Sequence, residues 1–271
     1  MATVHEVVAA IERLAPLPYA QDWDNVGLLL EPPGTRVVGT VFLAVDLNEA
    51  VFAEALEAGA DFLVLYHPPI FGGIQRLRLD DPMQKLLLQA IQRGIPIHSP
   101  HTALDAAQGG LNDWLLEAFG RIEHRRPIQP YVDEEPSQGI GAGRVASLAE
   151  PLPLPVAVER IKAHLGLTHV RVAAAPGHAA PGAMIREVAV CPGAGGSLFQ
   201  GLMGPDLFLT GEMRHHDVLA KVSSGASVVV CDHTNTERGY LPLFAARIQA
   251  QLGNGARVLV SSVDRDPLQI R

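Results

Sequence analysis

The chain is poor in aromatic and in charged residues. Of its 271 residues, 5% are aromatic and 18% are charged, whereas 48% are hydrophobic. This hydrophobic fraction excludes an intrinsically disordered chain, and a core must be built mainly from aliphatic side chains. The length fits one large domain or two small ones.

Basic residues are outnumbered by acidic ones. Lys and Arg total 21 and Asp and Glu total 29, so the net charge is −8. A protein that binds nucleic acid without sequence preference needs a basic surface. We therefore do not expect nucleic acid as a partner.

Cysteines and long apolar segments are also scarce. The two cysteines, Cys191 and Cys231, exclude a disulfide framework and fit a reducing compartment. No apolar run reaches the roughly 18 residues that a membrane-spanning helix needs. The first residues lack the pattern of a secretory signal. We expect a cytoplasmic protein with no membrane partner.

Hydrophobic periodicity predicts an α/β protein in which strands alternate with helices. The first half is predicted to contain helices over 4–14, 47–58, 83–93 and 109–119, and strands over 27–30, 37–45, 62–66 and 95–98. The second half is predicted to contain helices over 156–165, 212–222 and 241–252, and strands over 169–174, 186–191, 206–210, 227–231 and 257–263.

Short matching blocks indicate an internal duplication. Residues 101–105 read His-Thr-Ala-Leu-Asp and residues 233–237 read His-Thr-Asn-Thr-Glu, each after a predicted strand. With the matching order of elements, they predict a first α/β repeat over residues 1–125 and a second over 151–271. Residues 126–150 are predicted to connect them, and this Pro- and Gly-rich region includes the acidic run Asp133–Glu135.

Imidazole and carboxylate side chains follow several of the predicted strands, where sites in α/β sheets collect. His67, His101 and His233 follow strands, and Asp105 and Glu237 each lie four residues after a His. These donors suit divalent zinc, iron or manganese. Two such ions could polarise a substrate and activate a water molecule.

A purely structural role for the two acids is the alternative. Thr102 with Asp105, and Thr234 with Glu237, fit the spacing of a capping box at a helix N-terminus. In that case the acids would stabilise a helix end and bind no metal.

The densest polar cluster lies in residues 210–217. Glu212 precedes His215 and His216 by three and four positions, so on a continuous helix all three share one face. They could then supply an acid and base for catalysis. A solvated first helical turn is the alternative interpretation.

The glycine-rich segment 193–204 follows a predicted strand and is expected to precede a helix. Its backbone amides could bind an anion such as phosphate. A tight packing turn is the alternative. The segment lacks the lysine of a P-loop and the acidic partner of a dinucleotide fingerprint, so we expect no dinucleotide cofactor.

Five segments together resemble the Nif-three-like family, many members of which are described as GTP cyclohydrolase I type 2 homologues. They are residues 22–28, 66–71, 101–105, 210–217 and 233–239. The Tyr-His-Pro and Arg-His-His-Asp sequences within them are similar to the eukaryotic-type branch. The resemblance implies two intertwined repeats of α-β-(β-α)3 type with mixed sheets, a toroidal hexamer, and a dinuclear metal centre between the repeats.

The same resemblance implies a ligand set. It assigns His67, Asp105, His233 and a bridging Glu237, and it places the first histidine of the family pattern at Tyr66. A neutral phenol, with a pKa of about 10, is a poor ligand. Three alternatives follow: a weak second metal site, Tyr66 bound as phenolate, or replacement of the missing imidazole by His101.

The leading hypothesis is a cytoplasmic, metal-dependent hydrolase that acts on a nucleotide or related heterocycle. The cyclohydrolase-type activity follows from the resemblance alone. The ligands suit one or two divalent ions, with zinc, iron, manganese and nickel all possible. The alternatives are a non-catalytic metal-binding ring and a protein-interaction scaffold linked to transcription regulation.

Overall fold

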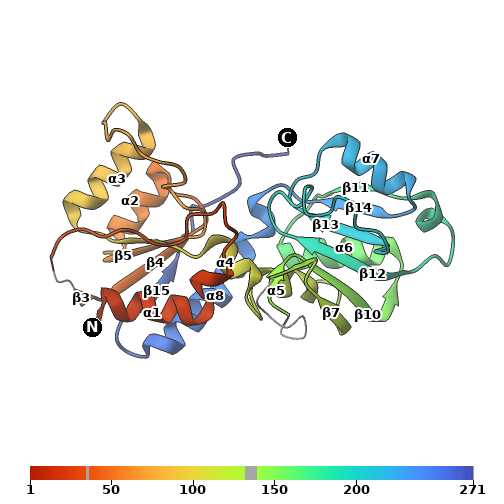
Figure 1. Ribbon diagram of the computed structural model, residues 1–271, viewed down its shortest axis with the longest axis horizontal. Coiled ribbons are helices and arrows are strands. Elements are labelled where there is room, and N and C mark those ends of the chain that lie inside the picture. Colours follow the sequence, from red (N-terminus) through yellow and green to blue (C-terminus); the bar gives the residue numbers. More distant parts are fainter. Residues whose placement is uncertain (35–36, 132–138, 271) are drawn as a thin grey trace. The chain divides into compact units, whose positions relative to one another are not determined.

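A computed structural model of the protein describes residues 1–34, 37–131 and 139–270, so the acidic run Asp133–Glu135 lies outside the described residues. The chain forms two compact units. The first unit comprises Met1–Leu104 and Tyr240–Asp264, and the second comprises Asp105–Gly239 and Arg265–Arg271. The chain thus enters the second unit and returns to the first, as the colours of Figure 1 show for α8 beside α1.

The first unit contains a five-stranded mixed sheet. Its strand order is β15-β4-β5-β6-β2, with β2 antiparallel to β6 and the other pairs parallel. A separate antiparallel pair joins β1 to β3. The elements are β1 (Ala2–Thr3), α1 (Val4–Leu14), η1 (Leu17–Tyr19), β2 (Gly27–Leu30), β3 (Val37–Val38), β4 (Thr40–Ala44), α2 (Glu49–Glu57), β5 (Phe62–Leu65), α3 (Pro82–Arg93), β6 (Ile97–Ser99), α8 (Leu241–Leu252) and β15 (Arg257–Val260).

Local sequence signals explain the ends of these helices. A capping box starts α1, because Thr3 Oγ1 accepts a hydrogen bond from the Glu6 amide and the Glu6 carboxylate accepts one from the Thr3 amide. Gly94 ends α3 in the left-handed conformation, with φ of +67°. The neighbouring strands β4 and β5 are buried throughout and form the aliphatic centre of this unit.

The second unit contains a six-stranded mixed sheet of order β11-β14-β13-β12-β10-β7. Strands β12, β13 and β14 run parallel, and the remaining pairs are antiparallel. The elements are α5 (Leu111–Glu117), β7 (Ile122–Arg126), β8 (Gln129–Pro130), β9 (Gly141–Ala142), β10 (Arg144–Leu152), α6 (Leu154–Leu165), β11 (Arg171–Ala173), η3 (Pro176–Ala179), β12 (Ile185–Cys191), β13 (Leu207–Thr210), α7 (His215–Ser223), β14 (Ser227–Val230), η4 (Thr234–Thr236) and η5 (Arg238–Tyr240). The short helix α4 (His101–Ala106) begins in the first unit and ends in the second.

Strand order confirms the predicted duplication within an α/β fold with mixed sheets. Each sheet contains three parallel strands followed by an antiparallel edge strand: β4-β5-β6-β2 in one unit and β12-β13-β14-β11 in the other. A helix precedes that edge strand in both cases, α1 before β2 and α6 before β11. Between the first two parallel strands, the first unit has α2, whereas the second has the glycine-rich segment.

Strand β10 starts within residues 126–150 and pairs with β12 and β7. Two local predictions need correction. The glycine-rich segment leads through turns into β13, with no helix between them in the described chain. Helix α7 starts at His215, so Glu212 is not on its face. The backbone amide of Glu212 instead donates to the carbonyl of Gly193.

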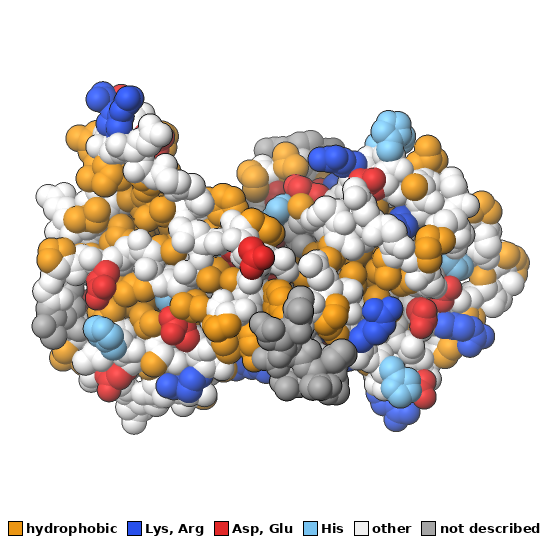
Figure 2. All heavy atoms as spheres, viewed as in Figure 1, with side chains coloured by type: hydrophobic (Ala, Val, Ile, Leu, Met, Phe, Trp, Pro, Cys, Tyr) orange, Lys and Arg blue, Asp and Glu red, His pale blue; other side chains and the backbone are white. Residues whose placement is uncertain are grey.

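The loop between β5 and α3 exposes apolar side chains. Phe71 is 55% exposed, and Ile74, Leu77 and Leu79 are exposed as well. In Figure 2, hydrophobic side chains gather near the base of this loop and basic ones lie at its tip. Among the residues that the structure describes, none of the helices has the length and apolarity to cross a membrane.

Candidate metal centre

An uncommon backbone conformation occurs at the first residue of one His-Thr block and directly before the other. His101, two residues after β6, has φ of +24°, and Asp232, two residues after β14, has φ of +66°. Residues other than glycine rarely adopt positive φ, and such strain concentrates at functional sites. The backbone therefore independently distinguishes the two blocks that the sequence singled out.

His67 follows β5 in the first unit and pairs with Asp46. His67 Nδ1 lies 2.9 Å from Asp46 Oδ1. An ionised carboxylate can only accept, so this contact places the ring proton on Nδ1 and leaves Nε2 as the ligand atom.

His101 makes a similar pair with Asp24, also in the first unit. Its Nδ1 lies 2.7 Å from Asp24 Oδ1, and the Asp24 side chain is fully buried. Burial alone would raise the pKa of Asp24, but hydrogen bonds and charge from His101, and hydrogen bonds from Thr102, outweigh it and lower the pKa. In the sequence, Asp24 shows only the features of a turn, so its pairing with His101 could not be predicted.

Tyr66 is buried, with 2% of its surface exposed. Its ring centroid lies 5.1 Å from that of His67 and 5.4 Å from that of His101. The residue that stands at the position of the family's first histidine thus lies beside both candidate ligand imidazoles of this unit.

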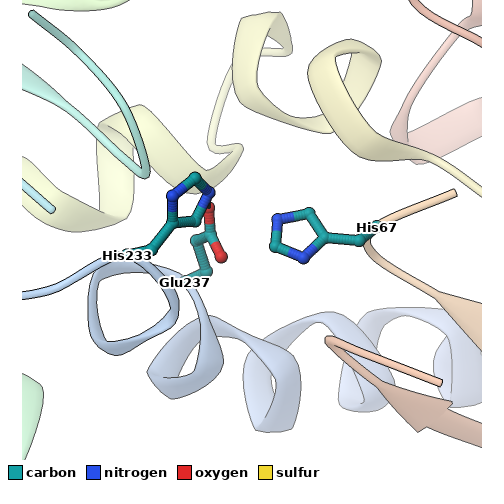
Figure 3. Close-up of side chains that lie close together, drawn as sticks. All are labelled: His67, His233 and Glu237. Carbon is teal, nitrogen blue, oxygen red and sulfur yellow. Dashed lines mark ion pairs between the residues drawn. The ribbon is translucent and has the colours of Figure 1, made fainter. Parts of the chain in front are cut away.

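His233 and Glu237 lie together in the second unit, one on each side of η4. His233 Nε2 is 3.5 Å from Glu237 Oε1, and His233 Nδ1 is 3.4 Å from Glu212 Oε2. Figure 3 shows the His233 and Glu237 side chains rising from the same segment of chain. Glu212 was predicted to pair with His215 and His216, but it contacts His233.

The glycine-rich segment passes close to His233 and Glu237. A Cβ atom on Gly193 would lie 2.8 Å from both Glu237 Oε1 and His233 Nε2. The amide of Gly193 donates to Thr236 Oγ1 at 2.8 Å, and that of Gly195 donates to Thr210 Oγ1 at 3.0 Å. These two amides are therefore already used in packing.

Asp105, the last predicted ligand, affects the same cysteine as Glu237. Burial raises the pKa of the Cys191 thiol, and the negative charges of Asp105 and Glu237 raise it further. The neutral thiol itself is a poor metal ligand.

The capping-box alternative is wrong for both blocks. Thr102 is the second residue of α4, and its amide and hydroxyl donate to Asp24. Thr234 lies within η4 and its hydroxyl donates to Asp266 Oδ2 at 2.8 Å. Neither threonine occupies the N-cap position that the motif requires.

His215 and His216 are the first two residues of α7 and are exposed. Their ring centroids lie 5.4 Å apart. Being exposed at a helix start, they have room to exchange protons with solvent.

The donor chemistry suits a divalent metal ion. A divalent ion is bound by imidazole nitrogens and carboxylate oxygens, and the imidazoles are commonly oriented by further carboxylates. These groups are present here, and Gly193 leaves space beside them. The fold and these side chains define a class: a duplicated α/β protein with candidate metal ligands after its strands.

Comparison with known proteins gives the family within that class. The model of the Duf34/NIF3 (NGG1p interacting factor 3) family matches residues 2–267, and the chain belongs to this family. It is 40% identical to the NIF3 homolog of Schizosaccharomyces pombe, over 92% of this chain and 91% of that protein. It is 37% identical to the NGG1-interacting factor 3 of Saccharomyces cerevisiae, over 99% and 97%.

A solved structure confirms the fold. The Bacillus cereus protein related to NIF3 superposes with a TM-score of 0.85 at 20% identity, over 99% of each chain. The identities of 37–40% to yeast proteins agree with the predicted similarity to the eukaryotic-type branch.

Proposed function

We propose that His67, His233 and Glu237 hold a divalent metal ion. Each offers one donor atom, an imidazole nitrogen or a carboxylate oxygen. Figure 3 draws these three side chains. The single observation that carries the proposal is the cradle at Gly193, where a Cβ would lie 2.8 Å from a donor atom of both His233 and Glu237. Asp105, whose charge acts on the same thiol as that of Glu237, is the proposed further ligand of a second ion bridged by Glu237.

The proposed activity is hydrolysis of a nucleotide or related heterocycle in the cytoplasm. A bound divalent ion would polarise the electrophilic centre of such a substrate. His215 or His216 would exchange a proton with the substrate or solvent, since both are exposed. Glu212 lies 3.4 Å from His233 Nδ1, so we assign it the orientation of that ring instead of proton transfer. The substrate class rests on the family resemblance.

Metal content of purified variants tests the metal site. Glu237→Ala should remove most of the bound metal, because the proposed bridging oxygens vanish and two cations are left to repel each other. His67→Ala and His233→Ala should each deplete mainly one ion. Glu123→Ala, at an exposed position of β7, is the control. Unchanged metal in Glu237→Ala would contradict the shared site.

Turnover tests the hydrolase proposal separately. We expect the metal-loaded protein to hydrolyse at least one member of a panel of nucleotides, phosphoesters and peptides, and Glu237→Ala to lose that activity. Full metal occupancy without turnover on the whole panel would favour a non-catalytic metal-binding ring.

A second candidate function is protein interaction. The relative in Saccharomyces cerevisiae is named for an interaction with NGG1. By that likeness we propose a scaffold role linked to transcription regulation as the alternative. Capture of a protein partner that is equal for the wild type and for metal-free Glu237→Ala would favour it.

We further propose that the chain assembles into a hexameric ring. The exposed apolar side chains of the loop between β5 and α3, Phe71 and Leu79 among them, support self-association. Light scattering should report an assembly of about six chains at micromolar concentration. A monomer under these conditions would contradict this part of the proposal.

A further inference from the structure

We propose that Asp24 is a positioning residue that fixes the tautomer and orientation of His101, so that Nε2 of His101 serves as a ligand atom for a divalent metal ion. This role rests on the proposed metal function and deepens it. His101 would supply the imidazole that Tyr66 does not offer. The proposal gives a role to the segment around Asp24, for which the sequence indicated only a turn.

The hydrogen bonds of Asp24 determine where the ring proton of His101 resides. Asp24 Oδ1 accepts from the Asn25 amide at 2.7 Å and lies 2.7 Å from His101 Nδ1. Asp24 Oδ2 accepts from the amide of Thr102 at 3.1 Å and from its hydroxyl. A carboxylate that receives this many donors is ionised and can only accept. His101 Nδ1 must therefore carry the proton, and Nε2 keeps its lone pair.

The geometry around this pair is rigid. The Asp24 side chain is fully buried, and the neighbouring Asn25 amide group donates to the carbonyl of Ile70, three residues after His67. The backbone of His101 has a φ of +24°. Such a strained backbone conformation persists only where the surrounding structure holds it. The segment at Asp24 is thus tied both to His101 and to the loop that starts at His67.

The ring of His101 lies near the ring of His67, the other candidate ligand histidine of this unit. The His101 and His67 ring centroids are 5.5 Å apart, and the rings are nearly perpendicular, at 81°. The side chain of His101 is 15% exposed, so the ring is mostly buried but still accessible to solvent. The two rings are therefore neighbours within this unit.

The other two candidate ligand histidines also have an acidic oxygen beside Nδ1. His67 Nδ1 is 2.9 Å from Asp46, and His233 Nδ1 is 3.4 Å from Glu212. Histidines that bind metals commonly donate their second ring N–H to a carboxylate, which fixes the tautomer and strengthens the ligand. His101 shares this feature although the family ligand pattern does not assign it.

The test combines two measurements on three proteins: the wild type, Asp24→Asn and Thr102→Val. Long-range nitrogen–proton NMR spectra of metal-free protein with 15N-labelled histidine report which ring nitrogen of His101 carries the proton. Competition with a chelator then gives the dissociation constant for Zn²⁺. Thr102→Val is the matched control, because it removes a hydroxyl donor to Asp24 and leaves the contact with His101.

We expect the Nδ1–H tautomer in the wild type and in Thr102→Val, and its loss or mixing in Asp24→Asn. Zinc affinity should fall about 10- to 100-fold in Asp24→Asn and stay near the wild-type value in Thr102→Val. An unchanged tautomer and zinc affinity in Asp24→Asn would overturn the proposal. Equal losses in Thr102→Val would also overturn it, because they would indicate a general structural role.

Failure of the metal function itself gives a different result. If the wild type shows the Nδ1–H tautomer but binds no Zn²⁺, the proposed metal function and the ligand role of His101 are both overturned. The orienting effect of Asp24 on the ring would then still be supported by the NMR spectra of Asp24→Asn.

Discussion

At the scale of single residues, Gly193 is a position at which both the backbone conformation and the space beside it require glycine. It combines a φ of +57° with a Cβ position only 2.8 Å from donor atoms of His233 and Glu237. Real Cβ atoms do not approach other atoms this closely, so any other residue must displace the pair. A glycine at this position thus allows the positive φ of the turn and also leaves space beside the candidate metal ligands.

Gly193→Ala should therefore weaken metal binding roughly tenfold or more, the size of effect seen when groups around a metal are disturbed. Gly201→Ala is the control, because Gly201 has a similar φ of +71° but open space around it. Both variants should lose about 1 kcal/mol of stability from the backbone strain. Calorimetric titration with Zn²⁺ and thermal unfolding separate the two effects. Equal metal affinity in both variants would show that the space beside Gly193 is not used.

Tyr66 decides whether two metal ions bind equally. If the phenol is not a ligand, Tyr66→His should raise the occupancy of the weaker site, because it restores an imidazole, and Tyr66→Phe should leave metal content unchanged. If Tyr66 binds as phenolate, Tyr66→Phe should instead lose metal. Metal titration followed by elemental analysis distinguishes these outcomes. Unchanged stoichiometry and affinity in Tyr66→His would contradict the lost-ligand interpretation.

At the scale of elements, a buried ion pair fixes the segment that follows Asp105. Arg144 in β10 is fully buried, and its Nε donates to Asp113 Oδ1 in α5 at 2.8 Å. The same guanidinium donates to the carbonyl of Ala106 at 3.1 Å, one residue after Asp105. Sequence reasoning missed Arg144, because it lies in the region predicted to connect the repeats.

Arg144→Met should lower the free energy of unfolding by about 3–5 kcal/mol, because it removes the only one of the two arginines paired with Asp113 that is itself buried. Arg125→Met is the control, since Arg125 is 48% exposed and 3.3 Å from the same carboxylate, and it should cost less than about 1 kcal/mol. Urea unfolding measures both. Adding Asp113→Leu to Arg144→Met should recover part of the loss. A small effect of Arg144→Met alone would contradict the importance of this pair.

Strand β6 carries a pH-sensitive group. Burial lowers the pKa of His98 to about 4 from its ordinary value of 6.5, and Glu12 Oε1 lies 3.8 Å from Nε2. The unfolded chain therefore takes up a proton below about pH 6.5 that the folded chain accepts only near pH 4. Stability is full above pH 6.5 and is lost as the pH falls towards 4, by on the order of 3 kcal/mol.

His98→Leu should flatten the stability profile between pH 6.5 and 4. His124→Leu, at an exposed position of β7, should keep the wild-type slope. Urea unfolding at a series of pH values gives both profiles. If the slope persists in His98→Leu, another group causes the acid sensitivity.

At the scale of the whole molecule, the features set by local sequence were predictable. Helices α1 and α8 and strand β2 have the predicted bounds, since their apolar periodicity and their breakers are local signals. The order of strands and helices, repeated in both halves, predicted the fold class before any contact was known.

Features that depend on contacts distant in sequence were not predictable. The pairing of Asp24 with His101 spans 77 positions, and nothing near Asp24 indicates it. The start of α7 was misplaced because Glu212 is a good helix former, whereas its amide bonds to Gly193 in a different segment. The return of the chain through α8 and β15 to the first sheet also depends on parallel pairing between β15 and β4.

The central claim is that His67, His233 and Glu237 bind a divalent metal ion. Anomalous scattering at several absorption edges, from crystals of protein purified without nickel, tests it most directly. We predict a metal peak about 2 Å from an imidazole nitrogen of both histidines and from a Glu237 oxygen, at distances typical of such ligands. No peak at these residues after incubation with divalent metals, or a peak bound by other side chains, would contradict the claim.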